Sequence, residues 1–493
     1  MSDPFLHGIA SGDPLPDRVM LWTRITGGTD APVPVEWRIS RDPELDGVLK
    51  SGQTEASAEH DWSVHVDVDG LEPETHYYYA FTALGATSPV ARTRTLPAIT
   101  DHVRFAMGSC AKFNAGFFNA YARIAARHDL NFLLHLGDYI YEASNTPPAT
   151  QTPGADIGRP FEPLTECVTL DDYRTRYNQY HRDHDVQLLH LSHAIIPTLD
   201  DHEFADGAWR DGATEHKPEY GPWSERKANA FRAREEWLPI RRPDPNNPER
   251  VFRSVPLGDL ADLFLIDTRT RRDEPVPEPA MSDPNRTALG PEQKQWLLDS
   301  IDSSNARWRL LANPSVMGRT WSPDLPEDVK PGLVKVKLLA ADGKGPDYDQ
   351  WDGYPAEREA VLDHIADNGI DNLVVLSGDV HVSLVLDLHH NEDAPVAAEF
   401  VTPSLTSQNL DDKMKWPRHS PEMEAIVTRA EEFLKDWRWA DLDSHGYVVI
   451  DVTPERVTAE YWHVDEVLEP TPKEQLASTW AVEHGSRRAT RVS

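Results

Sequence analysis

Apolar and polar residues alternate along three stretches near the start of the chain. These stretches are residues 19–25, 33–39 and 62–68, and turn residues such as Asp69 and Gly70 follow the last of them. A period of two is typical of strands that bury one face. The pattern therefore predicts an all-β unit over residues 1–97.

The segment Leu71-Glu-Pro-Glu-Thr-His-Tyr-Tyr-Tyr79 follows these stretches. It resembles the corner of immunoglobulin-type and fibronectin-type sandwiches, where a tyrosine hydroxyl ties a turn to its strand. We therefore expect residues 1–97 to form a packing sandwich that carries no chemistry of its own.

Beyond residue 97 the pattern changes to continuous apolar runs separated by segments of helical spacing. Residues 103–108 and 130–136 have the pattern of buried strands, with a helical segment at 116–128 between them. Strand, helix and strand in this order indicate parallel pairing. Similar strand-type runs end near residues 199, 269, 313, 377, 405 and 461, and further helices are expected at 171–190, 224–237, 291–301 and 355–367. The sequence thus predicts an α/β domain over residues 98–465. Residues 466–493 are expected to be a tail that packs on this domain or is partly mobile.

Side chains that can bind metals follow four of the apolar runs at the point where each run ends. Because ligands of open α/β sheets gather outside the carboxyl ends of the strands, we expect these side chains to lie together. Thiolate and phenolate suit ferric iron, whereas carboxylates suit calcium or magnesium, so the mixture indicates more than one ion. The residues are Cys110, Asp138, Tyr141, Asp201, His202, Asp379 and His381. Asp138 stands where it could be the shared carboxylate of a two-metal site, which suits attack of metal-bound hydroxide on phosphorus.

Each of these residues alone has a simpler explanation. Cys110 could be a small buried hydrophobe, and Tyr141 a core residue with a satisfied hydroxyl. Asp201 and His202 could be a helix cap beside a surface imidazole. Four separate strands that all end in metal-binding side chains are much less expected by chance. The joint pattern therefore favours a metal site.

Charge and cysteine content limit the partners. The chain has 49 basic and 82 acidic residues, a formal net charge of −33 at pH 7. Such a surface repels nucleic-acid backbones, and a phosphorylated substrate must be attracted by local positive charge. With only Cys110 and Cys167, a disulfide framework is excluded. No apolar run reaches the length needed to span a bilayer.

The first eight residues lack a basic region followed by an apolar core, so we expect no export signal in this chain. The expected location is extracellular or periplasmic if a leader has been removed, and cytoplasmic otherwise. A monomer is favoured because the sandwich covers one flank of the larger domain.

Four ordered motifs together resemble the PhoD-type alkaline phosphatases of the metallophosphoesterase superfamily. They are Gly108-Ser-Cys110, Gly137-Asp-Tyr-Ile-Tyr141, Asp200-Asp-His-Glu203 and Ser377-Gly-Asp-Val-His381. Flanking segments at 7–14, 265–269, 350–355 and 399–404 are similar as well. The resemblance extends over nearly the whole chain, and the set of motifs is far more specific than any one of them.

The resemblance implies a four-layer αββα metallophosphoesterase domain behind an immunoglobulin- or fibronectin-like sandwich. It also implies hydrolysis of phosphate mono- and diesters with Fe³⁺ and two Ca²⁺ ions, with Zn²⁺ or Mn²⁺ as alternatives. The implied iron ligands are Cys110, Asp138, Tyr141, Asp379 and His381. The implied calcium ligands are Asp138 and Asp201, with Asp206 near the position where the family often shows paired Asn.

Two residues are expected to act on the substrate. His202 stands where related phosphoesterases keep a histidine that contacts the phosphoryl group or the leaving oxygen. Residues 238–241 resemble a family segment whose arginine faces the phosphate, so Arg241 is the expected arginine and Arg269 the second candidate. The small-molecule substrate would then be hydrolysed by in-line attack, with an arginine offsetting charge on the transferred group.

Three alternatives remain at this stage. A purple-acid-type phosphatase also combines a sandwich with a phosphoesterase domain, but it would show Asp in the first motif and Gly-His-x-His in the last. A generic two-metal phosphodiesterase would use Zn²⁺ or Mn²⁺ and leave Cys110 and Tyr141 unbound. A binding protein that keeps the fold without turnover is disfavoured by the intact ligand motifs.

Overall fold

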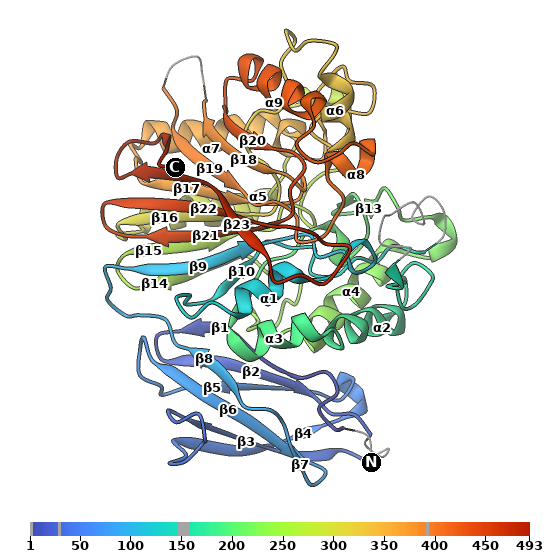
Figure 1. Cartoon of the computed structure of the whole chain (residues 1–493), viewed down its shortest axis with the longest axis vertical. Coiled ribbons are helices and arrows are strands. Elements are labelled where there is room, and N and C mark those ends of the chain that lie inside the picture. Colours follow the sequence, from blue (N-terminus) through green and yellow to red (C-terminus); the bar gives the residue numbers. More distant parts are fainter. Residues whose placement is uncertain (1–2, 28–30, 146–156, 391–393) are drawn as a thin grey trace.

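The computed structural model describes residues 3–27, 31–145, 157–390 and 394–493 (Figure 1). Its N-terminal unit, residues 3–97, consists of short antiparallel strands. They are β1 (Ile9–Leu15), β2 (Arg18–Arg24), β3 (Val33–Ser40), β4 (Lys50–Ala56), β5 (Ser63–Val68), β6 (His76–Ala83), β7 (Ala86–Thr87) and β8 (Ala91–Arg94). The three alternating stretches of the sequence are thus strands, as predicted.

The N-terminal unit has two groups of strands that share one buried core. β1, β2 and β5 form one group, and β4, β3, β6 and β7 form the other, with β8 paired to β6. Leu21 of the first group and Val35 and Phe81 of the second belong to the same buried cluster. The expected corner is also present, because the Tyr77 hydroxyl accepts a hydrogen bond of 2.8 Å from the backbone N–H of Glu72.

A ten-stranded sheet continues from this unit into the larger domain. Its order is β24-β23-β22-β21-β9-β10-β11-β1-β2-β5. The newly named strands are β9 (Val103–Gly108), β10 (Leu133–His135), β11 (Ile195–Pro197), β21 (Gly446–Val452), β22 (Arg456–Val464), β23 (Glu474–Glu483) and β24 (Ala489–Arg491). β9, β10 and β11 pair in parallel, as the strand–helix–strand pattern predicted.

The junction between the two parts is a parallel contact between β1 and β11 at Gly12 and Ile195. A Cβ atom at Gly12 would collide with the backbone carbonyl of Pro239, so only glycine allows this close approach. The N-terminal unit is therefore joined to the larger domain through a shared sheet as well as through the chain.

A second sheet of seven strands faces the first. Its order is β14-β15-β16-β17-β19-β18-β20. The strands are β14 (Arg253–Leu257), β15 (Ala261–Leu265), β16 (Trp308–Asn313), β17 (Leu373–Ser377), β18 (Ser383–Leu388), β19 (Ala397–Val401) and β20 (Trp437–Asp441). Phe105 and Leu134 of the first sheet share a buried cluster with Leu310 and Val374 of the second, so side chains of both sheets meet in one core.

Helices cover the outer faces of the two sheets (Figure 1). Those that pack with the first sheet are α1 (Asn119–Ala125), α2 (Leu170–His181), α3 (His184–Ser192) and α4 (Trp223–Trp237). Those that pack with the second are α5 (Gly290–Ser303), α6 (Lys330–Lys335), α7 (Pro355–Asp367), α8 (Leu410–Met414) and α9 (Pro421–Phe433). β12 (Ala208–Trp209) and β13 (Gly212–Ala213) form a small separate hairpin. None of the helices in the described ranges has the length and apolarity needed to cross a membrane.

Two segments differ from the sequence-based expectation. The helix expected over 171–190 is two helices, because the Asp183 carboxylate accepts from the N–H groups of Asp185 and Val186 and starts α3 as its N-cap. Residues 466–493 were expected to be a tail, but they contain β23 and β24. β23 pairs with β22 along residues 474–483, and Trp480 and Val482 lie in the core between the sheets.

We predict that Tyr77→Phe lowers the free energy of unfolding by about 1 kcal/mol, because the Glu72 N–H loses its acceptor. Urea unfolding of the purified protein would measure the loss. Tyr78→Phe, one residue along β6, is the matched control. Equal stability of the Tyr77 and Tyr78 variants would show that the corner contributes nothing.

We also predict that stability falls as the pH drops from about 6.5 towards 4. Burial lowers the pKa of His65, His190 and His193 to about 4 each. Below pH 6.5 the unfolded chain binds protons that the folded chain does not, and this favours unfolding. Urea unfolding at pH 7, 6 and 5 should show the decline. His193→Gln should make the decline in stability shallower. The control His60→Gln changes an exposed side chain. Identical slopes in the wild-type protein and both variants would contradict the explanation.

Candidate metal centre

The structure brings most of the predicted ligands into one buried cluster. Cys110, Asp138 and His381 have ligand atoms within 4.8 Å of one another, and so do Asp138, Asp201 and His202. A third group joins Asp138, Asp200, Asp201 and Asp379 under the same limit. Asp138 belongs to all three groups, which is the position expected of a carboxylate shared between ions.

These side chains come from strand ends of both sheets. Cys110, Asp138 and Asp201 follow β9, β10 and β11 of the ten-stranded sheet, whereas Asp379 and His381 follow β17 of the seven-stranded sheet. The cluster thus lies where the carboxyl ends of parallel strands from the two sheets meet. The strand-end pattern predicted that these side chains lie together, but it did not show that they come from two sheets.

The backbone at this cluster is unusual. Cys110, Asp138, Asp379 and His381 have positive φ angles of 62°, 55°, 70° and 65°. L-residues with side chains rarely adopt this region, and such strain concentrates at functional sites. Position 137 requires glycine for a steric reason, because a Cβ atom there would lie 2.5 Å from the backbone nitrogen of Asp200.

The carboxylates carry more negative charge than the surrounding protein neutralises. Asp138, Asp200 and Asp201 are at most 2% exposed. Burial, together with neighbouring carboxylates, raises the pKa of Asp138 and Asp200 well above the usual range. Among the described residues, Asp138 Oδ2 and Asp201 Oδ1 have no hydrogen-bond partner. Buried carboxylate oxygens without partners are costly, so this donor set fits bound cations.

One protein cation is already built into the cluster. The Arg269 guanidinium is fully buried and pairs with the carboxylates of Asp200, Asp349 and Asp379; its Nη2 lies 2.8 Å from Asp379 Oδ2. Arg272 Nη2 lies 2.5 Å from Asp349 Oδ1, the carboxylate oxygen that Arg269 does not contact, and so holds the Asp349 side chain in place. Arg269, the second candidate from the sequence, is thus the arginine at the centre.

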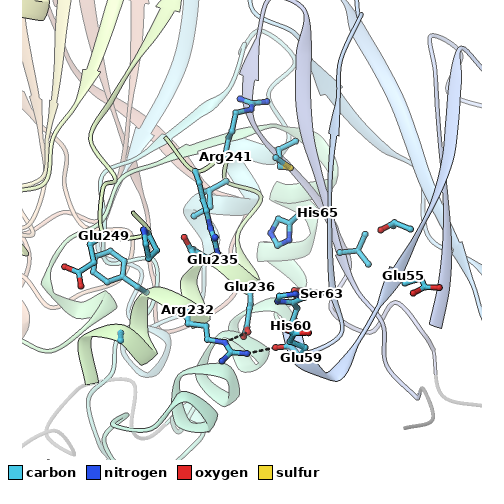
Figure 2. Close-up of a pocket in the computed structure, with 18 residues that line it drawn as sticks. Glu55, Glu59, His60, Ser63, His65, Arg232, Glu235, Glu236, Arg241 and Glu249 are labelled. Atoms are coloured by element: carbon cyan, nitrogen blue, oxygen red, sulfur yellow. Dashed lines mark hydrogen bonds and ion pairs between the residues drawn. The ribbon is translucent and has the colours of Figure 1, made fainter. Parts of the chain in front are cut away.

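Arg241 lies elsewhere. Its Nη2 is 2.7 Å from Asp67 Oδ1 on β5, and its backbone N–H donates to the Asp13 carboxylate at 2.7 Å. Figure 2 shows Arg241 in a groove between α4 and the N-terminal strands, near His65 and Glu235. The structure therefore does not place Arg241 with the ligands, because residues 238–240 lead the chain from α4 towards the N-terminal unit.

Cys110 and Tyr141 belong to one small buried cluster with Phe161, and each is 1% exposed. Burial, and next the charge on Asp138, raises the pKa of both side chains well above their usual values. A bound cation has the opposite effect, since it favours thiolate and phenolate. The Tyr141 hydroxyl accepts from Ser407 at 2.6 Å and lies 3.4 Å from His381 Nε2. Tyr141 is thus beside the predicted iron ligands.

His202 is oriented by Glu142, which sequence analysis did not single out. His202 Nδ1 lies 2.7 Å from Glu142 Oε2, and the His202 backbone N–H donates to Asp138 Oδ1 at 3.2 Å. Burial alone would lower the pKa of His202, but the charges on Glu142, Asp138 and Asp201 outweigh burial and raise it well above its usual value. The imidazole is thus fixed in one orientation beside the carboxylates.

Asp206 lies outside the three ligand groups. Its Oδ1 accepts from Lys337 Nζ at 3.1 Å, and its backbone N–H donates to Glu142 at 2.7 Å. Its side chain is 36% exposed, so it faces the solvent side of the centre. The structure therefore does not bring Asp206 together with the other expected calcium ligands.

Several supporting residues were missed from the sequence. The Glu203 carboxylate accepts backbone N–H groups of Asp138, Tyr139 and Asp200, at 3.0, 2.7 and 2.7 Å. Glu203 belongs to the motif Asp200-Asp-His-Glu203, and its position after two acidic residues could have indicated its supporting role. Asp349 and Gln350, which contacts Asp379, come from the irregular segment 318–354. Gln350 begins one of the flanking segments that resemble the family, whereas no pattern distinguished Asp349.

Comparisons with known proteins identify the family to which the chain belongs. Residues 105–461 match the family described as PhoD-like phosphatase, and residues 1–97 match its N-terminal domain. The chain is 34% identical over 496 aligned residues to Alkaline phosphatase D of Bacillus subtilis (strain 168), covering 95% of this chain and 79% of that protein. A solved structure titled Structure of PhoD superposes with a TM-score of 0.87 at 31% identity, covering 100% of this chain and 93% of that one. These matches confirm the resemblance drawn from the motifs: the chain belongs to the PhoD-like phosphatase family.

Proposed function

We propose that this phosphatase hydrolyses phosphate mono- and diesters at the candidate metal centre. Family membership makes the chain a phosphoric ester hydrolase. One observation carries the assignment to this site: Asp138 joins three ligand groups that contain unpartnered buried carboxylate oxygens. Such a constellation suits chemistry on phosphate, which mainly requires positioning and charge stabilisation.

We further propose that the packing of the two sheets is the four-layer αββα architecture of metallophosphoesterases. A core shared by both sheets, with helices on their outer faces, supports this. The N-terminal unit, with its Tyr77 corner and its single core, would be the immunoglobulin- or fibronectin-like sandwich.

The proposed ions are Fe³⁺ and Ca²⁺. Cys110, Tyr141 and His381 would offer thiolate, phenolate and imidazole donors to ferric iron, with Asp138 and Asp379 beside them. Asp138, Asp200 and Asp201 form a purely carboxylate group suited to calcium. When bound, these ions supply charge that stabilises phosphate oxygens and acidifies water. Zn²⁺ or Mn²⁺ would be the alternative.

The protein residues around the ions would position the substrate. Glu142 occupies His202 Nδ1, which leaves Nε2 available to a substrate oxygen. Arg269 fixes the orientation of Asp200 and Asp379 and adds positive charge beside the phosphate. Glu203 holds the turn that carries Asp138. The presence of Cys110 in the cluster disfavours a purple-acid-type centre.

The purified enzyme should contain iron and calcium and should show a visible charge-transfer band. Tyr141→Phe should remove or shift this band, because phenolate bound to ferric iron is its expected source. Tyr139→Phe is the matched control, since the Tyr139 hydroxyl lies 2.8 Å from His190 and not in the ligand groups. Elemental analysis and absorption spectroscopy make the measurement. Zinc or manganese alone, without colour, would overturn the iron assignment.

Arg269→Met should lower kcat/KM for 4-nitrophenyl phosphate by about 100-fold or more, because charge stabilisation in a buried site is lost. Arg241→Met, at the groove of Figure 2, should change it less than about threefold. Metal content and unfolding temperature of both variants should be recorded alongside. A greater loss for Arg241 than for Arg269 would restore the assignment made from the sequence.

A further inference from the structure

A second group of metal-binding side chains lies outside the candidate metal centre. His419, Asp441 and Asp443 offer ligand atoms that all lie within 4.8 Å of one another. A fourth side chain, His463, reaches the same group, because its Nδ1 lies 3.6 Å from Asp441 Oδ2. We call these four residues the His–Asp cluster.

The His–Asp cluster joins elements of both sheets. Asp441 ends β20, the edge strand of the seven-stranded sheet, and Asp443 follows in the bend after it. His463 belongs to β22 of the ten-stranded sheet, and His419 lies just before Ser420, the N-cap of α9. The fold thus brings two imidazoles and two carboxylates together from three segments of the chain.

No basic side chain pairs with the two carboxylates of the cluster. His463 and Asp443 are 1% and 2% exposed, whereas the side chain of His419 is 55% exposed. Among the described residues, no lysine or arginine forms an ion pair with either aspartate. Arg418 is a neighbour in sequence, but its Nη2 donates to the Ser444 hydroxyl at 3.1 Å. Neighbouring carboxylates that are largely buried without a cationic partner are costly, so the cluster favours a bound cation.

Each carboxylate is held by the backbone and directs one oxygen at a histidine. Asp443 Oδ2 accepts the backbone N–H of His419 at 2.5 Å, and Asp443 Oδ1 faces His419 Nδ1. Asp441 Oδ1 accepts the N–H groups of Asp443 and Ser444 at 3.2 and 3.0 Å, and Asp441 Oδ2 faces His463 Nδ1. Hydrogen bonds that fix carboxylates in this way are typical of the surroundings of metal ligands.

The spacing of the facing atoms fits ligands of one ion. His419 Nδ1 and Asp443 Oδ1 are 3.2 Å apart, and His463 Nδ1 and Asp441 Oδ2 are 3.6 Å apart. In the part of the chain that the structure describes, no hydrogen bond joins either pair, so the buried His463 Nδ1 is aimed at the cluster without a partner. Its other ring nitrogen, Nε2, lies 3.2 Å from Ser383 Oγ. Tetrahedral zinc with bonds of about 2.0–2.1 Å separates neighbouring ligand atoms by about 3.3 Å.

We propose that the His–Asp cluster binds one Zn²⁺ ion through His419 Nδ1, Asp441 Oδ2, Asp443 Oδ1 and His463 Nδ1. Imidazole nitrogen together with carboxylate oxygen suits zinc, whereas calcium and magnesium prefer oxygen ligands alone. Four protein ligands leave no open position for water, as in structural zinc sites. The inference does not depend on the proposed function of the candidate metal centre.

An ion at this site would fasten a segment that supports the candidate metal centre. In residues 405–419, the Ser407 hydroxyl donates to the Tyr141 hydroxyl at 2.6 Å, and the Gln408 carbonyl lies 3.0 Å from His381 Nδ1. A histidine of the cluster ends this segment. Zinc would tie that end to β20 and β22 and would add to folding stability, as structural zinc does.

The test measures zinc in the purified full-length protein after incubation with Zn²⁺ and removal of the excess. Asp443→Asn and His419→Gln should each contain about one zinc ion per chain less than the wild type, because each loses a ligand. Iron and calcium contents should stay the same. Added Zn²⁺ at about a hundredfold excess over its Kd should raise the unfolding temperature of the wild type by about 3 °C more than that of either variant.

The matched control is His364→Gln. His364 Nε2 lies 2.9 Å from Asp302 Oδ1, an imidazole–carboxylate pair outside the cluster, so its loss should leave the zinc content unchanged. The exposed His419 guards against misfolding as an explanation, since its replacement disturbs no buried contact of its ring. Equal zinc contents in the wild type and both cluster variants, or an equal loss in the control, would overturn the proposal. Loss of one calcium ion instead of zinc would refute the assignment of the metal.

Discussion

Repulsion between buried carboxylates dominates the energetics of the candidate metal centre. Asp138, Asp200, Asp201 and Asp379 have oxygens within 4.8 Å of one another in a nearly dry environment. At that separation two such charges repel by about 4 kcal/mol even at a generous effective dielectric constant. Arg269 offsets part of this repulsion, and the carboxylate oxygens left without partners indicate where further positive charge belongs. A site of this kind would not survive in a chain selected for stability alone.

Much of the structure serves to hold that cluster in place. Two sheets present their strand ends to one point, and their shared core prevents them from separating. Glu203 secures the turn at Asp138 through three backbone N–H groups, and Glu142 secures His202. The left-handed backbone at four predicted ligands costs conformational free energy. The surrounding hydrogen bonds and core packing hold the backbone in this conformation.

The sequence predicted features that depend on local pattern. Alternating residues predicted the strands of the N-terminal unit, and the Tyr77 corner followed from a short local motif. Ligand-type residues at strand ends predicted which side chains gather in the candidate metal centre, because a strand end fixes where its side chain lies. Features that depend on the meeting of distant segments could not be predicted. Arg241 was chosen from its neighbours in sequence, whereas Arg269 reaches the cluster through the fold; likewise, the strands at 474–491 depend on pairing with β22.

The contact between β1 and β11 has a consequence for how such proteins can evolve. β11 runs directly into Asp200 and Asp201, so the N-terminal unit closes the sheet edge beside two acids of the centre. Removing that unit would expose unpaired backbone groups at this edge. A replacement domain would need a glycine at the position of Gly12 in order to approach β11 as closely. The N-terminal unit therefore cannot be exchanged as an independent module without rebuilding the sheet edge beside the candidate metal centre.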